Sequence, residues 1–518
     1  MPKPPRKQKF EKIFNDLQKV IDIDDSRGRS VPNNMNFTEE GFLTKDTGSS
    51  LFGAVETELC HSDFNYVKAS GTEHRIRAKG TSLQVFDAVT NTYSDIVASP
   101  TYTAGAEFGW QVYDDELWGC NGVENYFKYD GTTFTQYASA PKGNILQIFE
   151  DRMFVSGVST EPLSVYYSNV GNPAIFSGTD VVKPLGTDFV TDLKNYYGVL
   201  MIFKRDSIWK MTFVYEQVAA AFLPKLEQQS GNYGASSRKA VTWVENDLWF
   251  FNGREVRAIG YTDQQSGVFG INRSVISEPI KETLKLINID NMESVATYYY
   301  NRRFYLAVPL GATNANNTVF VSHLLYGNLW TKYTDRLKSN AHGFLEVEGI
   351  VYTSKSEGDY GMVKWDDSLK ADNGVAITSE VFFKKVENEE FNTFSTYRYL
   401  DLLFKNLEAT ITVNVREDAN DNRTVKTKQF FIGSVVEGEE NSLGEVDPGE
   451  YWIADSFGES VSATPFLRKK ISFLSKSQSI TVGLYNSSAT ETFTISAYSL
   501  VGFHETKALF AGSKITSM

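Results

Sequence analysis

The sequence contains very little cysteine, histidine or methionine. Among 518 residues there are two cysteines, five histidines and eight methionines. Cys60 and Cys120 alone cannot make the disulfide network that stabilises small secreted domains. The fold must therefore rest on a hydrophobic core, and folding in a reducing compartment is expected. Few ligands remain for a metal centre.

Long hydrophobic runs are also missing. No stretch reaches about 18 apolar residues, the length of a membrane-crossing helix, so no membrane span is predicted. The formal net charge is −13. An acidic chain does not bind nucleic acid over its whole surface, because that affinity comes from clustered Lys and Arg. It could still line a passage through which DNA slides without adhering.

Aromatic residues, in contrast, are abundant. The chain has 36 Phe and 27 Tyr, and apolar residues make up 41% of it. Tyr and Phe favour the half-buried faces of pleated sheets, so the composition indicates β structure. The apolar content is sufficient for a packed core. The length suits two or three domains.

Residues 1–45 are predicted to form an N-terminal arm. The first ten residues, MPKPPRKQKF, are basic and rich in proline, which disfavours helix. They are either a solvated tail or an anchor on an acidic partner or nucleic acid. The following segment, Glu11 to Asp22, has Ile13, Leu17 and Val20 at helical spacing, which predicts one short amphipathic helix.

Residues 46–375 repeat one pattern of short strands and turns. In DELWGCNGVENYFKYDG, Asp115 to Gly131, a strand, a polar turn and a second strand ending in an aromatic follow one another. Similar hairpins begin near residues 82, 115, 151, 198, 246, 301 and 349. One helix is expected among them, from Ile276 to Asn288, with Ser277 as its cap and Pro279 in its first turn.

The spacing of these hairpins is typical of a β-propeller, whose blades of four antiparallel strands repeat about every 40 to 50 residues. Six or seven blades fit in the segment. A single hairpin cannot bury its apolar face, whereas blades packed in a ring bury both faces and protect their edges. Each repeated hairpin is interpreted as the inner hairpin of a blade.

Residues 376–518 contain longer strands with cleaner alternation. In ATITVNV, Ala409 to Val415, the apolar residues Ile411, Val413 and Val415 fall on one face. Seven or eight such strands predict a C-terminal β-sandwich. The acidic, Gly-rich segment at 435–450 is predicted to be an exposed loop or a contact with a neighbour. The whole chain is therefore expected to be all-β.

No pattern in the sequence assigns a catalytic, cofactor-binding or metal-binding residue. Motifs for nucleotide binding, serine hydrolysis and zinc proteolysis are missing. Cys60 and His61 are adjacent, so they should point to opposite faces of a strand. The residues considered and set aside as ligands or acids are His61, His74, His323, His342 and His504, and the pairs Asp114–Asp115, Asp366–Asp367 and Glu389–Glu390, which are interpreted as solvated turn residues.

Two further features are interpreted as structural. SNVGNPAIFSG, Ser168 to Gly178, is similar to the Asp-box turn of sialidases, but Asn169 and Ala174 replace its Asp and aromatic. It is predicted to be a turn stabilised by Asn side chains and Pro173. The tryptophans in the expected blade strands are predicted to pack in the core, namely Trp118, Trp209, Trp249, Trp330 and Trp365.

Taken together, several segments resemble the tail-nozzle and packaged-DNA stabilisation proteins of tailed bacteriophages, which carry a propeller at the distal end of short tails. The resemblance covers most of the chain. It lies in the succession of strands and turns along the chain more than in any single sequence motif. The segments that carry it are Asn15–Gly53, Asp151–Gly178, Asp192–Phe213, Ser236–Gly260, Tyr299–Thr334 and Ile377–Lys405.

The resemblance implies a structural protein of the virion tail, synthesised in the host cytoplasm. It implies a homo-oligomeric ring, expected to be a hexamer, around the DNA exit channel. Its partners would be an adaptor or ring protein, tail fibres, and genomic DNA that passes without sequence-specific contact. The protein would help to retain packaged DNA and conduct it on infection. No enzyme activity and no cofactor follow from the resemblance.

Three alternatives remain open. A carbohydrate- or receptor-binding propeller would expose Trp and Tyr on one face. A virion-associated glycosidase or lyase would place two carboxylates within reach of a sugar at the mouth of the propeller channel. A baseplate or tail-tip protein of a long-tailed phage would share the architecture and differ in its neighbours.

Overall fold

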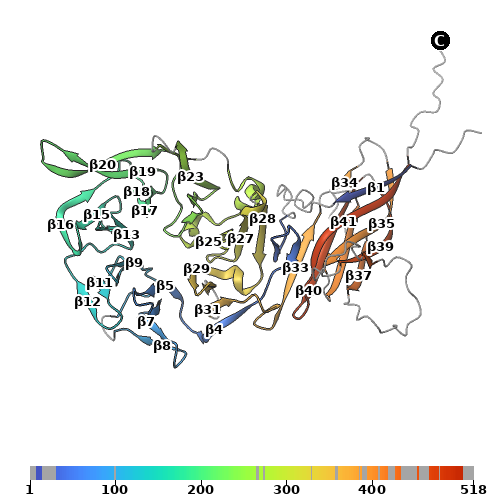
Figure 1. Ribbon diagram of the computed structural model, residues 1–518, viewed down its shortest axis with the longest axis horizontal. Helices are drawn as coiled ribbons and strands as arrows, with labels where there is room; N and C mark the ends of the chain where they lie inside the picture. The colour runs from blue at the N-terminus through green and yellow to red at the C-terminus, as the bar shows by residue number, and fades with distance from the viewer. Residues whose placement is uncertain are drawn as a thin grey trace, which may run out of the picture. The chain divides into compact units, whose positions relative to one another are not determined.

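The structure is a computed structural model, shown in Figure 1. It describes residues 8–14, 31–97, 101–263, 268–271, 275–327, 329–355, 360–383, 386–387, 394–405, 409–417, 426–432, 452–453, 466–477 and 479–505. The chain divides into two compact units. We call Ser49–Leu324 with Tyr333–Asp367 the propeller unit, and Met1–Gly48 with Leu325–Lys332 and Ser368–Met518 the sandwich unit.

The propeller unit consists of four-stranded antiparallel sheets that follow one another around a common centre (Figure 1). The first three blades contain β5 (Cys60–Val67), β6 (Glu73–Lys79), β7 (Ser82–Asp87) and β8 (Thr92–Asp95); β9 (Gly109–Tyr113), β10 (Glu116–Cys120), β11 (Tyr126–Tyr129) and β12 (Phe134–Tyr137); and β13 (Ile145–Phe149), β14 (Arg152–Ser156), β15 (Val165–Asn169) and β16 (Asn172–Val182).

The next three blades have the same strand order. They contain β17 (Val190–Tyr196), β18 (Val199–Lys204), β19 (Ile208–Glu216) and β20 (Ala221–Ser230); β21 (Val241–Val244), β22 (Asp247–Phe251), β23 (Val256–Asp263) and β24 (Val268–Ile271); and β25 (Ala296–Tyr300), β26 (Arg303–Val308), β27 (Thr318–His323) and β28 (Leu329–Thr334). The first part of β28, up to Lys332, pairs within this sheet but is grouped with the sandwich unit.

The seventh blade closes the ring with a strand from the beginning of the unit. It contains β29 (Ala341–Val347), β30 (Ile350–Lys355) and β31 (Tyr360–Trp365), and its fourth strand is β4 (Ser49–Glu56). β4 pairs antiparallel with β31, with Ser49 opposite Trp365. The described residues thus form an all-β propeller with seven blades, and joining the two ends of the unit within one sheet protects its edges.

Two-residue turns join the first and second strands in six of the seven blades; in the first blade, residues 68–72 join β5 to β6. In five blades both turn residues have positive φ, the conformation of a type I′ turn, which suits the twist of antiparallel strands. These turns are Asp114–Asp115, Glu150–Asp151, Tyr197–Gly198, Asn301–Arg302 and Glu348–Gly349. Five of the hairpin starts that the sequence indicated coincide with them. The turn residues therefore allowed the blade repeat to be recognised in the sequence.

The interpretation of the repeated hairpins as innermost needs correction. The segment from Asp115 to Gly131 forms β10 and β11, the second and third strands of its blade, and the start near residue 82 falls on a third strand, β7. Middle strands read as continuous apolar runs because both their faces are covered, and every residue of β18 is buried. The first strands carry more polar residues and lie around the centre.

A recurring tyrosine connects neighbouring blades. The Tyr66 hydroxyl, at the end of β5, donates to the Asp115 carbonyl in the next blade's turn at 2.6 Å. The Tyr196 hydroxyl donates to the Asn246 carbonyl at 3.1 Å, and Tyr300 makes the same bond to Gly349. Each bond ties the end of a first strand to the turn of the following blade. The blades are therefore held together by hydrogen bonds as well as by apolar packing.

The expected helix is present but shorter than predicted. Glu278–Ile280 is a 3-10 turn and α2 covers Lys281–Leu284 only. Ser277 does not cap it; its hydroxyl accepts a hydrogen bond from the Val256 N–H at 2.9 Å. The serine thus fixes the helical segment to β23 instead of to the helix end.

The sandwich unit has two sheets around one core. The first contains β2 (Met35–Phe37), β3 (Leu43–Lys45), β41 (Thr494–Glu505), β35 (Phe394–Lys405), β39 (Phe466–Ser477) and β38 (Trp452–Ile453), with β1 (Gln8–Phe14) on β41. The second contains β33 (Val375–Phe382), β40 (Ser479–Ser488), β36 (Ala409–Glu417) and β37 (Lys426–Ile432), with β32 (Ala371–Asp372) on β33 and β34 (Val386–Glu387) on β40.

Buried residues of both sheets form a single cluster. Leu400 and Leu402 of β35 pack with Ile411 and Val413 of β36, all at most 1% exposed. This arrangement defines a β-sandwich. The alternation in ATITVNV is confirmed, since Val415 is buried with Ile411 and Val413 on the core side.

The N-terminal residues differ from the sequence-based picture of an arm. Gln8–Phe14 form β1, which pairs with β41, and β2 and β3 extend the same sheet. The predicted helix at Glu11–Asp22 is wrong for Glu11–Phe14, because backbone pairing with a distant strand outweighs local periodicity. The rest of that helix, the first seven residues and the acidic segment at 435–450 lie outside the described residues.

Candidate functional site

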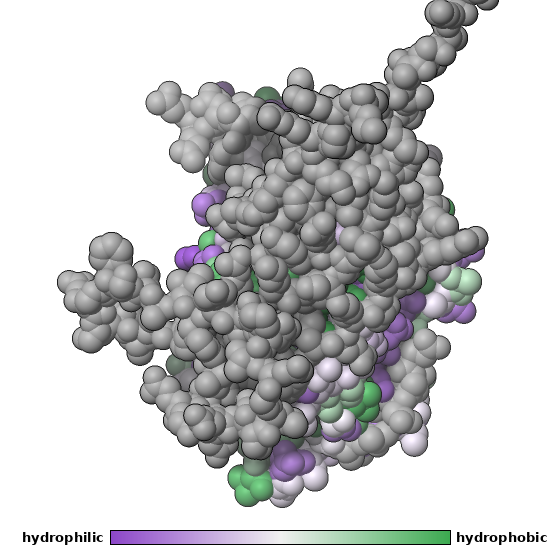
Figure 2. All heavy atoms as spheres, turned by 90° about the vertical axis from the view of Figure 1, so that its right-hand side faces the viewer, coloured by the Kyte–Doolittle hydropathy of each residue, from purple (hydrophilic) through white to green (hydrophobic). Residues whose placement is uncertain are grey.

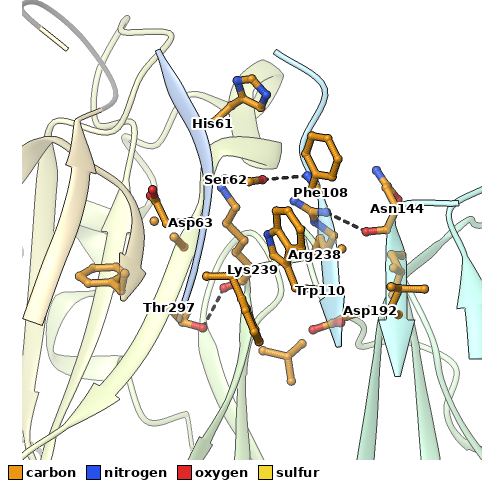
Figure 3. A pocket seen from close by; sticks show the side chains of 18 of the residues that line it. His61, Ser62, Asp63, Phe108, Trp110, Asn144, Asp192, Arg238, Lys239 and Thr297 are labelled. Carbon is orange, nitrogen blue, oxygen red and sulfur yellow. Dashed lines mark hydrogen bonds between the residues drawn. The ribbon is translucent and has the colours of Figure 1, made fainter. Parts of the chain in front are cut away.

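A cavity of about 340 Å³ lies at the centre of the propeller unit. Figure 3 shows the side chains that line it. All seven blades contribute, mostly from the beginning of their first strands or the residues just before them. One lining residue from each blade in chain order is Asp63, Trp110, Ile145, Lys194, Val241, Thr297 and Phe344. A site on the propeller axis is thus assembled from residues as far apart in the sequence as His61 and Ser354.

Alternation along β17 places two charges in this cavity. Asp192 and Lys194 line it, while Leu193 between them is buried in the core between blades. The Lys194 Nζ and Asp192 Oδ2 atoms are 3.0 Å apart. Burial raises the pKa of Asp192, and the Lys194 charge opposes that shift.

A cluster around Glu107 braces the propeller across several blades. Glu107 precedes β9, and its carboxylate lies 2.5 Å from Arg238 Nη2 and 2.8 Å from Lys239 Nζ, both just before β21. His342 Nε2 of β29 is 3.0 Å from the same carboxylate. Arg238 also donates to the Asn144 carbonyl, which precedes β13, at 2.7 Å. One carboxylate therefore links the second, fifth and seventh blades, and Arg238 adds the third.

The electrostatics of the cluster favour a charged Glu107 and a neutral His342. Burial alone would raise the pKa of Glu107, but the Lys239 and Arg238 charges outweigh it and hold the pKa well below its usual range. Burial lowers the pKa of His342, and Lys239 lowers it further. The cluster is a stable ion-pair network around neutral pH.

A hydrogen bond and stacked rings connect the first two blades where they line the cavity. The Phe108 N–H donates to the Ser62 hydroxyl at 2.8 Å. Trp110 stacks on Phe108, with ring centroids 5.0 Å apart, and on Phe64 at 6.0 Å. Because neighbouring rings occupy the faces of Trp110, this indole offers little surface for stacking a sugar.

Each of the two carboxylates that line the cavity already has a partner within the protein. Asp192 pairs with Lys194, and Asp63 accepts a hydrogen bond from the Cys60 thiol at 3.0 Å. A glycosidase needs one carboxylic acid and one carboxylate placed on either side of a sugar. The described residues that line the cavity do not form an evident acid–carboxylate pair of this kind.

Two kinds of functional element are missing from the described residues. No group of three or more His, Cys, Asp or Glu side chains there could hold a metal ion. In the same part of the chain, no helix is long and apolar enough to span a membrane.

A second feature is the hairpin of β19 and β20, which runs out beyond the other strands in Figure 1. We call residues 214–223, VYEQVAAAFL, the apolar tip. Its large apolar side chains are exposed, namely Val214 (47%), Tyr215 (53%), Val218 (95%), Phe222 (64%) and Leu223 (42%). Tyr215 lies opposite Phe222 and Val214 opposite Leu223, so both faces of the tip are apolar.

Such an exposed apolar group usually marks a contact surface. The face of the molecule shown in Figure 2 differs, since its coloured residues mix small hydrophobic areas with hydrophilic ones. The apolar tip was not predicted from the sequence. The sequence shows apolar residues after Phe213, but only the structure shows that their side chains are exposed.

Several residues set aside on sequence grounds occupy structural positions, whereas His61 lines the axial cavity and His342 belongs to the cluster around Glu107. Asp114 and Asp115 form a turn, and the Asp115 carboxylate accepts from the Ala69 N–H at 2.6 Å. Asp366 lies 3.4 Å from Lys364. His74 stacks on Tyr66, and His61 and His323 are buried. His504 lies in β41, and Glu389–Glu390 fall outside the described residues.

The sialidase-like segment and the tryptophans also serve the fold. Val170 and Gly171 turn the chain between β15 and β16, and the Asn172 side chain accepts from the Ala174 N–H at 3.1 Å. Four tryptophans are buried and Trp365 is half-buried against the core of the last two blades; the buried four are Trp118, Trp209, Trp249 and Trp330.

Comparison with known proteins gives similarity of fold only. No known protein family and no curated protein matches the sequence. Among solved structures, Raptor from Chaetomium thermophilum is similar over 65% of this chain, with 11% identity and a TM-score of 0.41. The chain covers 30% of the Raptor chain.

Two further structures match a similar share of the chain. The C-terminal WD40 domain of Sif2 shares 8% identity over 64% of this chain and 83% of its own, with a TM-score of 0.35. YCF48 bound to a D1 peptide shares 12% over 65% of this chain and 97% of its own, with a TM-score of 0.37. These values are low, so the propeller assignment rests on the strand order described above.

Proposed function

We propose that the protein is a structural subunit of a bacteriophage tail, a nozzle or tail hub that assembles as a ring around the DNA exit channel. It would retain packaged DNA and conduct it on infection. In such a ring the DNA passes through the space enclosed by the copies. The proposal combines the resemblance of the sequence with a site that is braced by ion pairs and offers no plain catalytic geometry.

The observation that carries the proposal is the apolar tip. Tyr215 and Phe222 form a cross-strand pair, with ring centroids 5.3 Å apart, that is left exposed on a projecting hairpin. A hairpin that is apolar on both faces is suited to insertion between two surfaces. Repeated head-to-tail contacts of this kind close into a ring when the rotation permits.

The test is electron microscopy of the purified protein, alone and with virion tails. We expect rings with a central channel, or decoration of the tail end. The variant Tyr215→Ser/Phe222→Ser should abolish rings while keeping the melting temperature. Val89→Ser is the matched control, because Val89 is 93% exposed on another turn of the propeller. Persistent monomers that ignore the tails would overturn the proposal.

A second candidate, a carbohydrate- or receptor-binding propeller, is favoured by the axial cavity. Its volume is within the range of small-molecule sites. A glycosidase or lyase remains a weaker form of this candidate, since it needs Asp63 and Asp192 to act as a pair. A polysaccharide screen for binding and for cleavage separates the two, because a binder retains the glycan intact.

A further inference from the structure

The cations of the axial cavity have more hydrogen-bond donors than their carboxylate partners use. Lys194 has three N–H groups, and among the described residues its one partner is Asp192, so two N–H groups remain there. Lys239 donates to Glu107 and to the His342 carbonyl, which leaves one. Arg238 has five N–H groups and uses three, on Glu107 and Asn144. These three side chains therefore keep several donors for another partner.

The carboxylates facing those cations are occupied. One Glu107 oxygen lies near both Lys239 and His342, and the other accepts from Arg238. Asp192 accepts from the Leu193 N–H at 2.8 Å and pairs with Lys194. The wall built by the fourth and fifth blades is thus rich in donors and poor in acceptors. An oxyanion supplies the missing acceptors, and charge-assisted bonds to it are strong.

The cations are also accessible. The side chains of Lys194, Lys239 and Arg238 are 26%, 21% and 16% exposed, and all three line the cavity. Partial burial strengthens an ionic contact relative to open water. The volume of about 340 Å³ accommodates a ligand of roughly one sugar ring.

The first blade contributes a hydrogen-bond acceptor to the cavity, in contrast to the donors of the fourth and fifth blades. This acceptor determines what else the ligand must carry. Asp63 of β5 lines the cavity, and within the described part of the chain its one hydrogen-bond donor is the Cys60 thiol. Its carboxylate can therefore accept from a hydroxyl group of the ligand. A simple inorganic anion would use the cations and leave Asp63 without a partner in the cavity, whereas a hydroxylated anion uses both walls.

We propose that the axial cavity binds a small hydroxylated oxyanion, such as a sugar acid. Its carboxylate contacts Lys194, Lys239 and Arg238, and its hydroxyls contact Asp63. This site is independent of ring assembly and of the apolar tip. It gives the propeller a ligand-binding role beside its structural one.

Isothermal titration calorimetry of the full chain tests the proposal with three probes. Glucuronate carries both features, inorganic phosphate carries only the oxyanion, and glucose carries only the hydroxyls. We expect glucuronate to bind with one site per chain and a Kd of about 1 mM or lower. Phosphate should bind more weakly and compete with glucuronate, and glucose should give no signal. Equal binding of glucose and glucuronate would overturn the oxyanion contact.

Variants locate the site. Lys194→Met should weaken glucuronate binding about tenfold, and Asp192→Asn/Lys194→Met should do the same without leaving an unpaired charge. Lys128→Met is the matched control, because Lys128 is 30% exposed and paired with the single carboxylate of Glu116 outside the cavity. Failure of wild-type protein to bind glucuronate, or equal losses in the control, would overturn the proposal.

Discussion

The two units are both all-β, but they differ in how far apart in the sequence their paired strands lie. In the propeller unit almost every pairing joins strands that are consecutive in the sequence, as β9 to β12 show. In the sandwich unit most pairings join strands that are distant in the sequence, although a few, such as β2 with β3 and β36 with β37, are local. Leu43 of β3 lies opposite Ile495 of β41, and β35 lies between β39 and β41. Local pairing repeats in the sequence, whereas distant pairing leaves no period.

Ring closure is the exception that brings distant pairing into the propeller. β4 and β31 are about 300 residues apart and still form one sheet. Closing a loop of this length costs conformational entropy that local hairpins do not incur. The seam between the last and first blades should therefore be the part of the propeller that behaves most like the sandwich.

The largest expected effect tests whether the two units are separate. Leu402→Ala in the sandwich and Leu200→Ala in the propeller both remove fully buried side chains, so each should cost about 3–5 kcal/mol. Scanning calorimetry should show two transitions, with each variant lowering only one. A single transition lowered by both variants would show that the units unfold together.

The next effect tests the seam. Phe52 of β4 packs on Phe86 and Tyr352, each at 5.1 Å between ring centroids. Phe52→Ala should cost about 3 kcal/mol and speed hydrogen exchange in β4 and β31. Phe213→Ala is the matched control, since Phe213 is also half-buried between two blades with an arginine over its ring. Equal exchange at the seam in both variants would contradict a special role for closure.

A smaller effect tests the brace around Glu107. Glu107→Gln leaves Arg238 and Lys239 without a countercharge in a partly buried site, so it should cost about 2 kcal/mol. Glu116→Gln breaks the more exposed pair with Lys128 and should cost less than about 1 kcal/mol. Urea denaturation followed by tryptophan fluorescence measures both. Similar costs would mean that the brace adds nothing special.

The same cluster predicts acid sensitivity of the propeller. The pKa of His342 is lowered on folding from 6.5, so stability should begin to fall as the pH drops below that value. The pKa of Glu107 is lowered from 4.5, so a further loss should follow below that pH. Glu107→Gln should reduce the second loss in melting curves recorded between neutral and acidic pH. An unchanged acid profile would contradict this assignment.

The smallest effect tests one bond between blades. Tyr196→Phe removes the hydroxyl that donates to the Asn246 carbonyl, which should cost about 1 kcal/mol. Tyr197→Phe alters a neighbouring hydroxyl that is 3.4 Å from the Asn246 side chain and should cost less. Thermal melting compares them. A larger cost for Tyr197→Phe than for Tyr196→Phe would show that the exposed Tyr197 makes the stabilising hydrogen bond.

The fold was predictable where it is determined by residues that are close together in the sequence. The turns at Asp114–Asp115 and Glu150–Asp151 mark the blades, and Ile411 and Val413 show their buried face by alternation. The candidate site was not predictable. Glu107, Arg238 and His342 look like ordinary surface residues in the sequence, and only closure of the ring brings them together.

The sequence by itself therefore determined the all-β class, the repeated hairpins and the buried faces, because these depend on turn chemistry and on the alternation of side chains along a strand. The tertiary structure alone decided that β4 completes the seventh blade, that Gln8–Phe14 join the sandwich, and that charges from separate blades meet on the propeller axis. Those outcomes depend on contacts between residues hundreds of positions apart, which no local pattern encodes.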